Sequence, residues 1–178
     1  MALRSIDILV SEHRAVEKAI TELEGLIDEF LVNSEVPGVS KQALGEIADY
    51  LSRHLLLHIE KENQALFPVL EKFLSPEAGP LTVMLDEHLQ IARSFCGLRG
   101  GVLELDQHPA TGGPAAARIR DHGRTLIYEL RNHLLKEERV LFPFAEGHMS
   151  EEDDRWIVER FEEIVSNTPD CEHARLKT

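Results

Sequence analysis

The stretch HIEKENQALFP at positions 58–68 returns as HLLKEERVLFP at positions 133–143, and the rest of the chain is organised around these two copies. Each copy contains a histidine, a glutamate four residues later, and a Leu-Phe-Pro sequence that begins eight residues after the histidine. The same offset of 75 residues places Glu12-His13 on Glu87-His88. One offset that superimposes three separate motifs indicates an internal duplication.

The spacing within each copy is suited to metal binding. Residues four apart lie on the same face of a helix, with about 5–6 Å between their Cβ atoms. His58 with Glu62, and His133 with Glu137, are therefore able to bind one metal ion each. Together with the repeated histidines His13 and His88, the duplication supplies four imidazoles and two carboxylates, which are enough for a dinuclear site.

The two glutamates of the repeat are the strongest indication of a metal. Glu62 and Glu137 recur on helix faces otherwise made of Leu, Ile and His. An unpaired buried carboxylate costs several kcal/mol, and two that face each other repel. Cations between them remove both objections: each carboxylate could bridge two ions, with His13, His58, His88 and His133 as terminal ligands. Mixed imidazole and carboxylate ligation suits iron first, with manganese, zinc or cobalt as substitutes, and the remaining open positions favour small-molecule chemistry.

Other readings of these side chains remain open at this point. A single histidine on an apolar face is more often a hydrogen-bonded core residue than a ligand, but a purely structural account leaves the repetition of His13 and His88 unexplained. His54, whose repeat mate is Glu129, is a fifth ligand, a hydrogen-bond partner of a ligand, or a surface residue.

The remaining titratable residues have plainer expected roles. Glu12, Glu17 and Glu87 are expected to face solvent, with hydrogen bonding to a ligand histidine as the alternative. His122 lies too far along its helix to share the site. His108, His148 and His173 are expected at the surface, and Cys96 is expected to be a buried small hydrophobe.

Composition narrows the class of protein. The chain has 178 residues, enough for one domain with a core, and its formal net charge of −13 argues against nucleic acid as a partner. The sequence contains no apolar run long enough for a membrane span and no signal peptide. Two cysteines without metal-ligand spacing favour a reduced, cytoplasmic protein.

Apolar residues at three- and four-residue steps predict an all-α fold. Predicted helices span about 5–31, 40–67, 81–105 and 114–142, with Ser40 as the N-cap of the second and Pro68 either kinking or ending it. A short fifth helix follows its cap Ser150, with a docking face of Trp156, Ile157, Phe161 and Ile164. Short connections favour an up-down-up-down four-helix bundle of two pseudo-twofold-related helical hairpins, occupying residues 1–165 with the fifth helix, followed by a tail at 166–178.

The ordered set His13, His58-x-x-x-Glu62, His88 and His133-x-x-x-Glu137, with Leu-Phe-Pro after each longer motif, resembles the hemerythrin-like (HHE cation-binding) family of bacterial type. The resemblance covers about residues 9–143. It implies a four-helix bundle with a non-haem, oxo- or hydroxo-bridged di-iron centre, in which Glu62 and Glu137 are the bridging carboxylates and the four histidines are terminal ligands.

The sequence departs from the oxygen-carrying members of that family. They have a further histidine where this chain has Ala92, and an aspartate as the final ligand where it has Glu137. The symmetric set is closer to bacterial proteins linked to iron-centre repair and to nitric oxide or peroxide handling. Two hypotheses follow: a di-iron protein that reacts with dioxygen, peroxide or nitric oxide, or a non-enzymatic module for iron storage, delivery, repair or sensing. The sequence indicates neither a protein partner nor an oligomeric state.

Overall fold

The computed structural model describes residues 3–32, 38–75, 79–107 and 112–168, and every regular element within these ranges is helical. Four helices are long: α1 (Arg4–Val32), α2 (Gly38–Lys61), α4 (Pro80–Gln107) and α5 (Gly112–Lys136). The shorter elements are the π-helical turns η1 (Glu62–Leu66) and η3 (Glu137–Leu141), and the helices α3 (Phe67–Leu70), α6 (Phe142–His148) and α7 (Glu151–Asn167).

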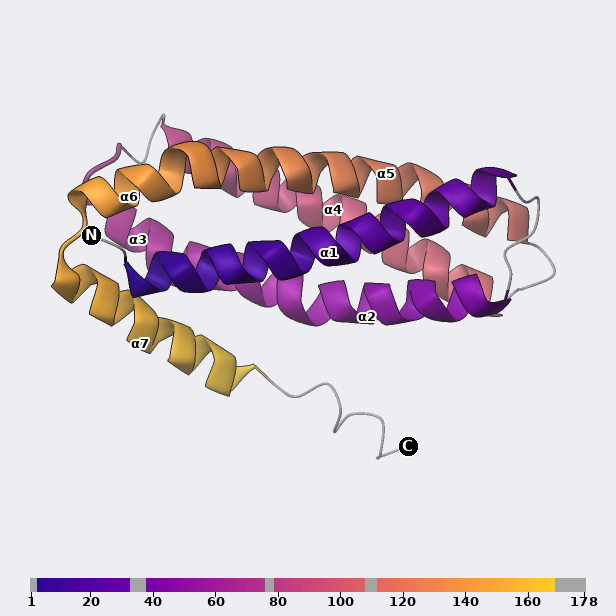
Figure 1. Cartoon of the computed structure of the whole chain (residues 1–178), viewed down its shortest axis with the longest axis horizontal. Coiled ribbons are helices and arrows are strands. Elements are labelled where there is room, and N and C mark those ends of the chain that lie inside the picture. The colour runs from indigo at the N-terminus through magenta and orange to yellow at the C-terminus, as the bar shows by residue number, and fades with distance from the viewer. Residues whose placement is uncertain (1–2, 33–37, 76–78, 108–111, 169–178) are drawn as a thin grey trace.

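The four long helices pack side by side (Figure 1). α1 contacts α2 and α5, and α4 contacts the same two helices, so each long helix has two long neighbours. α4 lies tight against α5 at Gly101, where an added Cβ would stand 3.1 Å from the backbone nitrogen of Ile119 and 3.3 Å from the carbonyl oxygen of Ala115. The absence of a side chain at this glycine allows the close approach.

Several of the predicted helix boundaries differ from the structure by one or two residues. α2 begins at Gly38, so Ser40 lies inside the helix rather than at its N-cap, and its hydroxyl donates to Glu29 at 3.4 Å. α4 continues to Gln107, past the predicted end at Leu105. The predicted cap of the last helix is confirmed: the Ser150 hydroxyl accepts from the backbone of Asp153, whose side chain accepts from the Ser150 backbone in a reciprocal capping box.

The buried apolar side chains form two separate clusters along the bundle. On α1, Leu9 belongs to one cluster and Val16 to the other, and His13 lies between them in sequence. On α4, Met84 and Ile91 flank His88 in the same way. The same change of cluster occurs between Leu55 of α2 and Ala65 of η1, and between Leu134 of α5 and Leu141 of η3. The fold thus sets a layer of buried polar side chains between two apolar layers.

The C-terminal helix covers one end of the bundle. Figure 1 shows α3, α6 and the start of α7 at the same end as the N-terminus, and α7 contacts α1, α2 and η1. Ile157, Phe161 and Ile164 are buried as predicted. Trp156 is not: 47 % of it is exposed, because it points into a surface hollow between α3 and α7.

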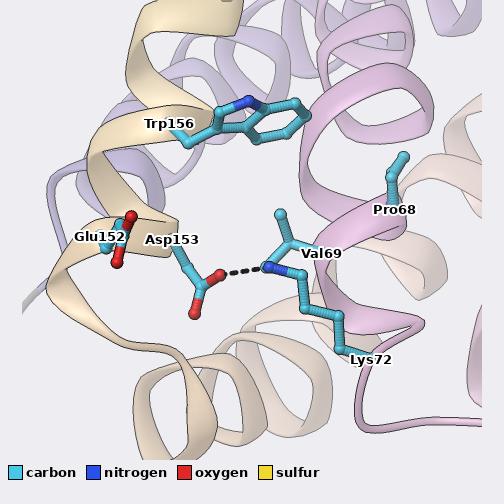
Figure 2. A pocket seen from close by; sticks show the side chains of 6 residues that line it. All are labelled: Pro68, Val69, Lys72, Glu152, Asp153 and Trp156. Atoms are coloured by element: carbon cyan, nitrogen blue, oxygen red, sulfur yellow. Dashed lines mark hydrogen bonds and ion pairs between the residues drawn. The ribbon is translucent and has the colours of Figure 1, made fainter.

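That hollow is shown in Figure 2. Pro68, Val69 and Lys72 line one wall, Trp156 and Glu152 the other, and the Lys72 ammonium pairs with Asp153 at 2.6 Å. Its lining residues are different from those of the buried polar layer.

Two further points complete the architecture. Among the described residues, no helix combines the length and the apolar character needed to cross a membrane. Most of the predicted tail, from position 169 onward, lies outside the described residues.

Candidate metal centre

The two glutamates of the repeat each begin a π-helical turn. The backbone N–H of Phe67 donates to the carbonyl of Glu62, five residues earlier, and Phe142 does the same to Glu137. Each phenylalanine is followed by a proline, which has no N–H to donate to the carbonyl four residues earlier. The wider turn keeps the chain helical through the proline, so the helix does not end at Pro68 but continues to Leu70. π-turns of this kind are frequent at functional sites.

The six predicted ligands meet in the layer between the two apolar clusters. They form two overlapping groups, and within each group one candidate ligand atom per residue lies within 4.8 Å of all the others. The first histidine pair, His13 and His58, and the second histidine pair, His88 and His133, each combine with both Glu62 and Glu137. All six residues are 0–3 % exposed.

Each carboxylate divides its two oxygens between the two histidine pairs. Glu62 Oε1 lies 3.4 Å from Nε2 of His58 in the first pair, and Oε2 lies 3.2 Å from Nε2 of His88 in the second. The oxygens of Glu137 lie 3.3 and 3.2 Å from the Nε2 atoms of the other two histidines. Donors on one ion at right angles, with bonds of roughly 2.1 Å, lie about 3 Å apart. The observed spacings therefore suit ligands grouped around two ions.

In the tautomer that suits their hydrogen-bond acceptors, the four imidazoles direct lone pairs at the middle of the cluster. Every Nδ1 atom faces an oxygen acceptor, so a neutral imidazole carries its proton there and leaves a lone pair on Nε2. The Nε2 atoms nevertheless approach each other to 3.2 Å in the first pair and 2.9 Å in the second. All four oxygens of Glu62 and Glu137 are buried without a hydrogen-bond partner. Lone pairs that converge in this way are stabilised by a metal cation or a proton between them, and the residues present fit a metal site.

The Nδ1 acceptors come from residues that the sequence analysis assigned to solvent or passed over. Glu12 Oε2 lies 2.9 Å from His58 Nδ1, and Glu87 Oε2 lies 3.0 Å from His133 Nδ1. The main expectation, that both glutamates face solvent, was therefore wrong, and the alternative of hydrogen bonding to a histidine of the cluster is the one that the structure shows. Each also pairs with the lysine that precedes a ligand glutamate, Lys61 or Lys136. Glu12 and Glu87 recur at the same 75-residue offset as the histidines, and this repetition is the sequence feature that pointed to a role at the cluster.

Two more acceptors were missed altogether. Glu138 Oε1 lies 2.9 Å from His13 Nδ1, and Asn63 Oδ1 lies 2.9 Å from His88 Nδ1. These residues directly follow the two candidate ligand glutamates and are repeat mates of each other. Hydrogen bonds to the outer nitrogen of a ligand histidine fix its tautomer and its orientation.

The phenylalanines of the repeat lie against the histidines. Phe67 stacks on His88 with ring centroids 5.5 Å apart and planes 6° apart, and Phe142 stacks on His13 at 5.3 Å and 26°. Both phenylalanines are also buried in the apolar cluster that contains Leu9 and Met84. They pack the core, as predicted, and at the same time shield one face of an imidazole from water.

The electrostatics of the metal-free cluster are unfavourable. Burial and the nearby carboxylate of Glu137 raise the pKa of Glu62 well above its usual range. Burial acts in the same direction on Glu137, but the imidazoles of His13 and His133 outweigh it and lower the pKa of that carboxyl. The opposite shifts describe one pair of acids that holds a single proton. Burial, reinforced by His133, lowers the pKa of His88 to about 3, so its imidazole is neutral near pH 7.

The remaining candidates lie away from the cluster. His54 is exposed and stacks on Tyr50 with centroids 4.3 Å apart, so it is neither a ligand nor a partner of one. His122 and His148 are both exposed, and His148 donates from Nδ1 to the carbonyl oxygen of Phe144. Cys96 is exposed, which contradicts the expectation of a buried residue. Glu17 pairs with Arg131 of α5 at 3.0 Å. His108 and His173 lie outside the described residues.

Comparisons with known proteins point to one family. The model of the hemerythrin HHE cation binding domain matches residues 4–145. The iron-sulfur cluster repair protein YtfE of Cronobacter sakazakii is 34 % identical over 122 residues, which cover 64 % of this chain and 51 % of the relative. The protein of the same name from Escherichia coli K12 is 32 % identical over 122 residues, with the same coverage. The chain thus spans about half the length of the curated relatives it matches.

Proposed function

This chain belongs to the hemerythrin HHE cation-binding domain family, and on that basis we propose that it holds two iron ions and brings them into contact with a small oxidant. The ligands are His13, His58, Glu62, His88, His133 and Glu137. The observation that carries the proposal is the division of each carboxylate between the two histidine pairs. That arrangement suits two ions that share both glutamates.

The number of protein ligands supports reactivity rather than a closed structural site. Each ion would receive two imidazole nitrogens and two carboxylate oxygens, and four donors leave coordination positions free on an ion that accepts six. When bound, a di-iron centre polarises and exchanges electrons with dioxygen, peroxide or nitric oxide. Manganese and zinc are possible substitutes with the same ligands.

The chain's own residues orient and shield the centre. Each imidazole donates an Nδ1–H hydrogen bond to one of four side chains, namely Glu12, Asn63, Glu87 and Glu138. These hydrogen bonds direct the four Nε2 lone pairs inward. The stacked rings of Phe67 and Phe142 exclude water from two imidazole faces. Because the six ligands are 0–3 % exposed, only a small molecule would reach them without a large rearrangement.

A second function is favoured by the relatives. Proteins about a third identical to this chain are named as iron-sulfur cluster repair proteins. We therefore keep as the alternative a non-enzymatic module that stores, delivers or senses iron, or supplies it for repair. Since the chain spans about half of those relatives, their activity is not assigned to it directly.

The fine topology belongs to the same proposal. We infer an up-down-up-down bundle in which residues 1–165 form one unit and a pseudo-twofold axis relates the hairpin of α1 and α2 to that of α4 and α5. The repeat supports this, because each ligand of one half has its mate 75 residues away in the other.

One experiment separates the two functions. Protein purified anaerobically is analysed for metal, reconstituted with iron(II), and mixed in a stopped-flow instrument with oxygen, peroxide or nitric oxide. We expect about two irons per chain and a near-ultraviolet band typical of an oxo-bridged pair after oxidation. The Glu62→Ala/Glu137→Ala double variant serves as the control without a centre. Full occupancy by zinc, or no spectral response to any oxidant, would contradict the redox function, while slow iron release to a chelator would favour the storage module.

A further inference from the structure

The residues that support the outer side of the four imidazoles follow the repeat, with one exception. Glu12 and Glu87 are repeat mates, and each accepts from the second histidine of its half at 2.9 or 3.0 Å. Asn63 and Glu138 are also repeat mates, and each contacts an Nδ1 atom at 2.9 Å. Here the chemistry differs, because one acceptor is a neutral amide and the other is a carboxylate.

This difference makes the two histidine pairs electrostatically unequal. The first pair, His13 and His58, is supported by two carboxylates, Glu138 and Glu12. The second pair is supported by the carboxylate of Glu87 and by the amide of Asn63. The nearby lysines repeat in their pairing, Lys61 with Glu12 and Lys136 with Glu87, but the Lys61 side chain is 7 % exposed and that of Lys136 is 44 % exposed. Lys61 therefore offsets part of the negative charge of Glu12, and the difference between Glu138 and Asn63 is additional to these two ion pairs.

When the group that accepts the Nδ1 hydrogen bond carries a full negative charge, the imidazole becomes a stronger electron-pair donor to a metal through Nε2. A carboxylate draws on the Nδ1 proton more strongly than an amide oxygen does, and this raises the basicity of Nε2. The histidine affected, His13, has its Nε2 atom 3.3 Å from Glu137 and 3.2 Å from His58, within the candidate ligand group. The higher basicity of His13 Nε2 therefore acts on one of the two proposed ion positions.

We propose that the two metal positions are inequivalent, with the position between His13 and His58 binding a divalent cation more tightly than the position between His88 and His133, because Glu138 and Asn63 differ. The inference rests on the proposed two-ion site. Loss of a hydrogen-bond partner to a ligand typically changes metal affinity by 10–100-fold. Since the Glu138 side chain is 45 % exposed, solvent weakens its effect, and we expect about a 10-fold difference.

The inequality has a chemical consequence. A symmetric centre fills both positions together and releases both together, whereas an unequal one passes through a state with a single ion held by His13 and His58. In that state Glu62 and Glu137 each keep one oxygen directed at the second pair. A single-ion form of this kind is poised to accept or give up one ion, which both proposed functions can use.

The test is a titration of the metal-free protein with cobalt(II), followed by its visible absorption, with proton NMR of the cobalt-shifted Nδ1–H signals to locate the first ion. Wild type is expected to bind two ions in two steps. Glu138→Gln and Asn63→Asp keep size nearly constant and are each expected to bring the two affinities together. The double variant Glu138→Gln/Asn63→Asp is expected to reverse the order, so that the first ion shifts the signals of His88 and His133.

The controls separate this inference from the proposed function. Glu60→Gln removes a charge from the exposed face of α2 and is expected to leave both steps unchanged. Two ions bound with equal affinity in wild type, or steps that respond to Glu60→Gln as strongly as to Glu138→Gln, would overturn the inequality while leaving the two-ion site intact. Binding of no ion, or of one only, would overturn the proposed function itself.

Discussion

Asp154 accepts hydrogen bonds from the backbone N–H of Ser5 at 2.9 Å and from its hydroxyl at 2.5 Å, although the two residues stand 149 positions apart. The second oxygen of Asp154 accepts from the backbone N–H of Arg4 at 3.0 Å. The first N–H groups of a helix have no partner within it. The first turn of α7 therefore supplies the cap of α1, and it ties the two ends of the described chain together.

Removing this cap should destabilise the whole bundle. We expect Asp154→Ala to lower the free energy of unfolding by about 1 kcal/mol, as the loss of a helix N-cap typically does. Urea unfolding followed by circular dichroism measures the change. Glu151→Ala removes a carboxylate from the same turn of α7 and is expected to cost only a few tenths of a kcal/mol. Equal effects of the two substitutions would mean that the negative charge of the turn stabilises the protein and that the hydrogen bonds of Asp154 do not.

Bridging and terminal ligands should differ in how many ions depend on them. Because Glu137 gives one oxygen to each histidine pair, Glu137→Ala is expected to reduce binding from two ions to fewer than one per chain. His13 belongs to one candidate group only, so His13→Ala should retain one ion. Elemental analysis after iron reconstitution and desalting provides the count. Retention of both ions by Glu137→Ala would remove it as a bridge.

The effect on stability of removing a charge from the cluster should be opposite with and without bound metal. Without metal, the buried pair of Glu62 and Glu137 must hold a proton that ordinary carboxyl groups release near pH 7, so Glu62→Gln is expected to raise the stability of the metal-free protein by on the order of 1–2 kcal/mol. With metal, the same substitution is expected to be destabilising. Saturating metal stabilises the wild type by about 2.7 kcal/mol per site at a hundred times the dissociation constant, and the variant loses part of this gain.

Thermal unfolding in chelator and in excess cobalt(II) tests the reversal, with Glu60→Gln as the matched control on the exposed face of α2. A Glu62→Gln variant that is less stable than wild type under both conditions would show that the carboxylate has a structural role independent of metal.

The capping box of α7 predicts a stability change in acid. The Lys72 ammonium and then the hydroxyl and backbone of Ser150 lower the pKa of Asp153 to about 2 from an ordinary value of 3.8. A carboxyl with a lowered pKa in the folded state contributes stability above its unfolded pKa and loses it as the pH falls through the folded pKa. The stability difference between wild type and Asp153→Asn should therefore be constant above about pH 4 and shrink towards pH 2. Chelator-treated samples exclude metal release, and a difference that grows in acid would contradict the assignment.

The contact between α4 and α5 should be intolerant of a side chain. A Cβ on Gly101 would lie 2.9 Å from Ile119 Cγ1 and close to the α5 backbone, so Gly101→Ala is expected to cost about 1–3 kcal/mol. Gly25→Ala is the control, because nothing lies within 4 Å of the added Cβ in α1, and it should stabilise by about 0.5–1 kcal/mol. Denaturant midpoints measure both changes. A stabilising Gly101→Ala would show that the helices separate easily there.

Local sequence carried the information for the helices and for the six candidate ligands. Helical periodicity placed His58 and Glu62 on one face, and the repeat paired them with His133 and Glu137. The structure then brought all six together in the interior. The role of His54 stayed open from the sequence, because it lies one turn from His58 at the edge of the inner face; the structure shows that it is exposed, since Leu55 beside it takes the core position.

The sequence by itself determined the helical fold class, the repeat and the residue types able to hold a metal, since periodicity and spacing depend only on neighbours along the chain. Only the tertiary structure decided that Glu12, Asn63, Glu87 and Glu138 hold the imidazoles, that Asp154 caps α1, and that Cys96 and Trp156 are exposed. Each of these depends on which helix lies opposite and at what rotation. That arrangement arises from packing between residues distant in sequence, which no local pattern encodes.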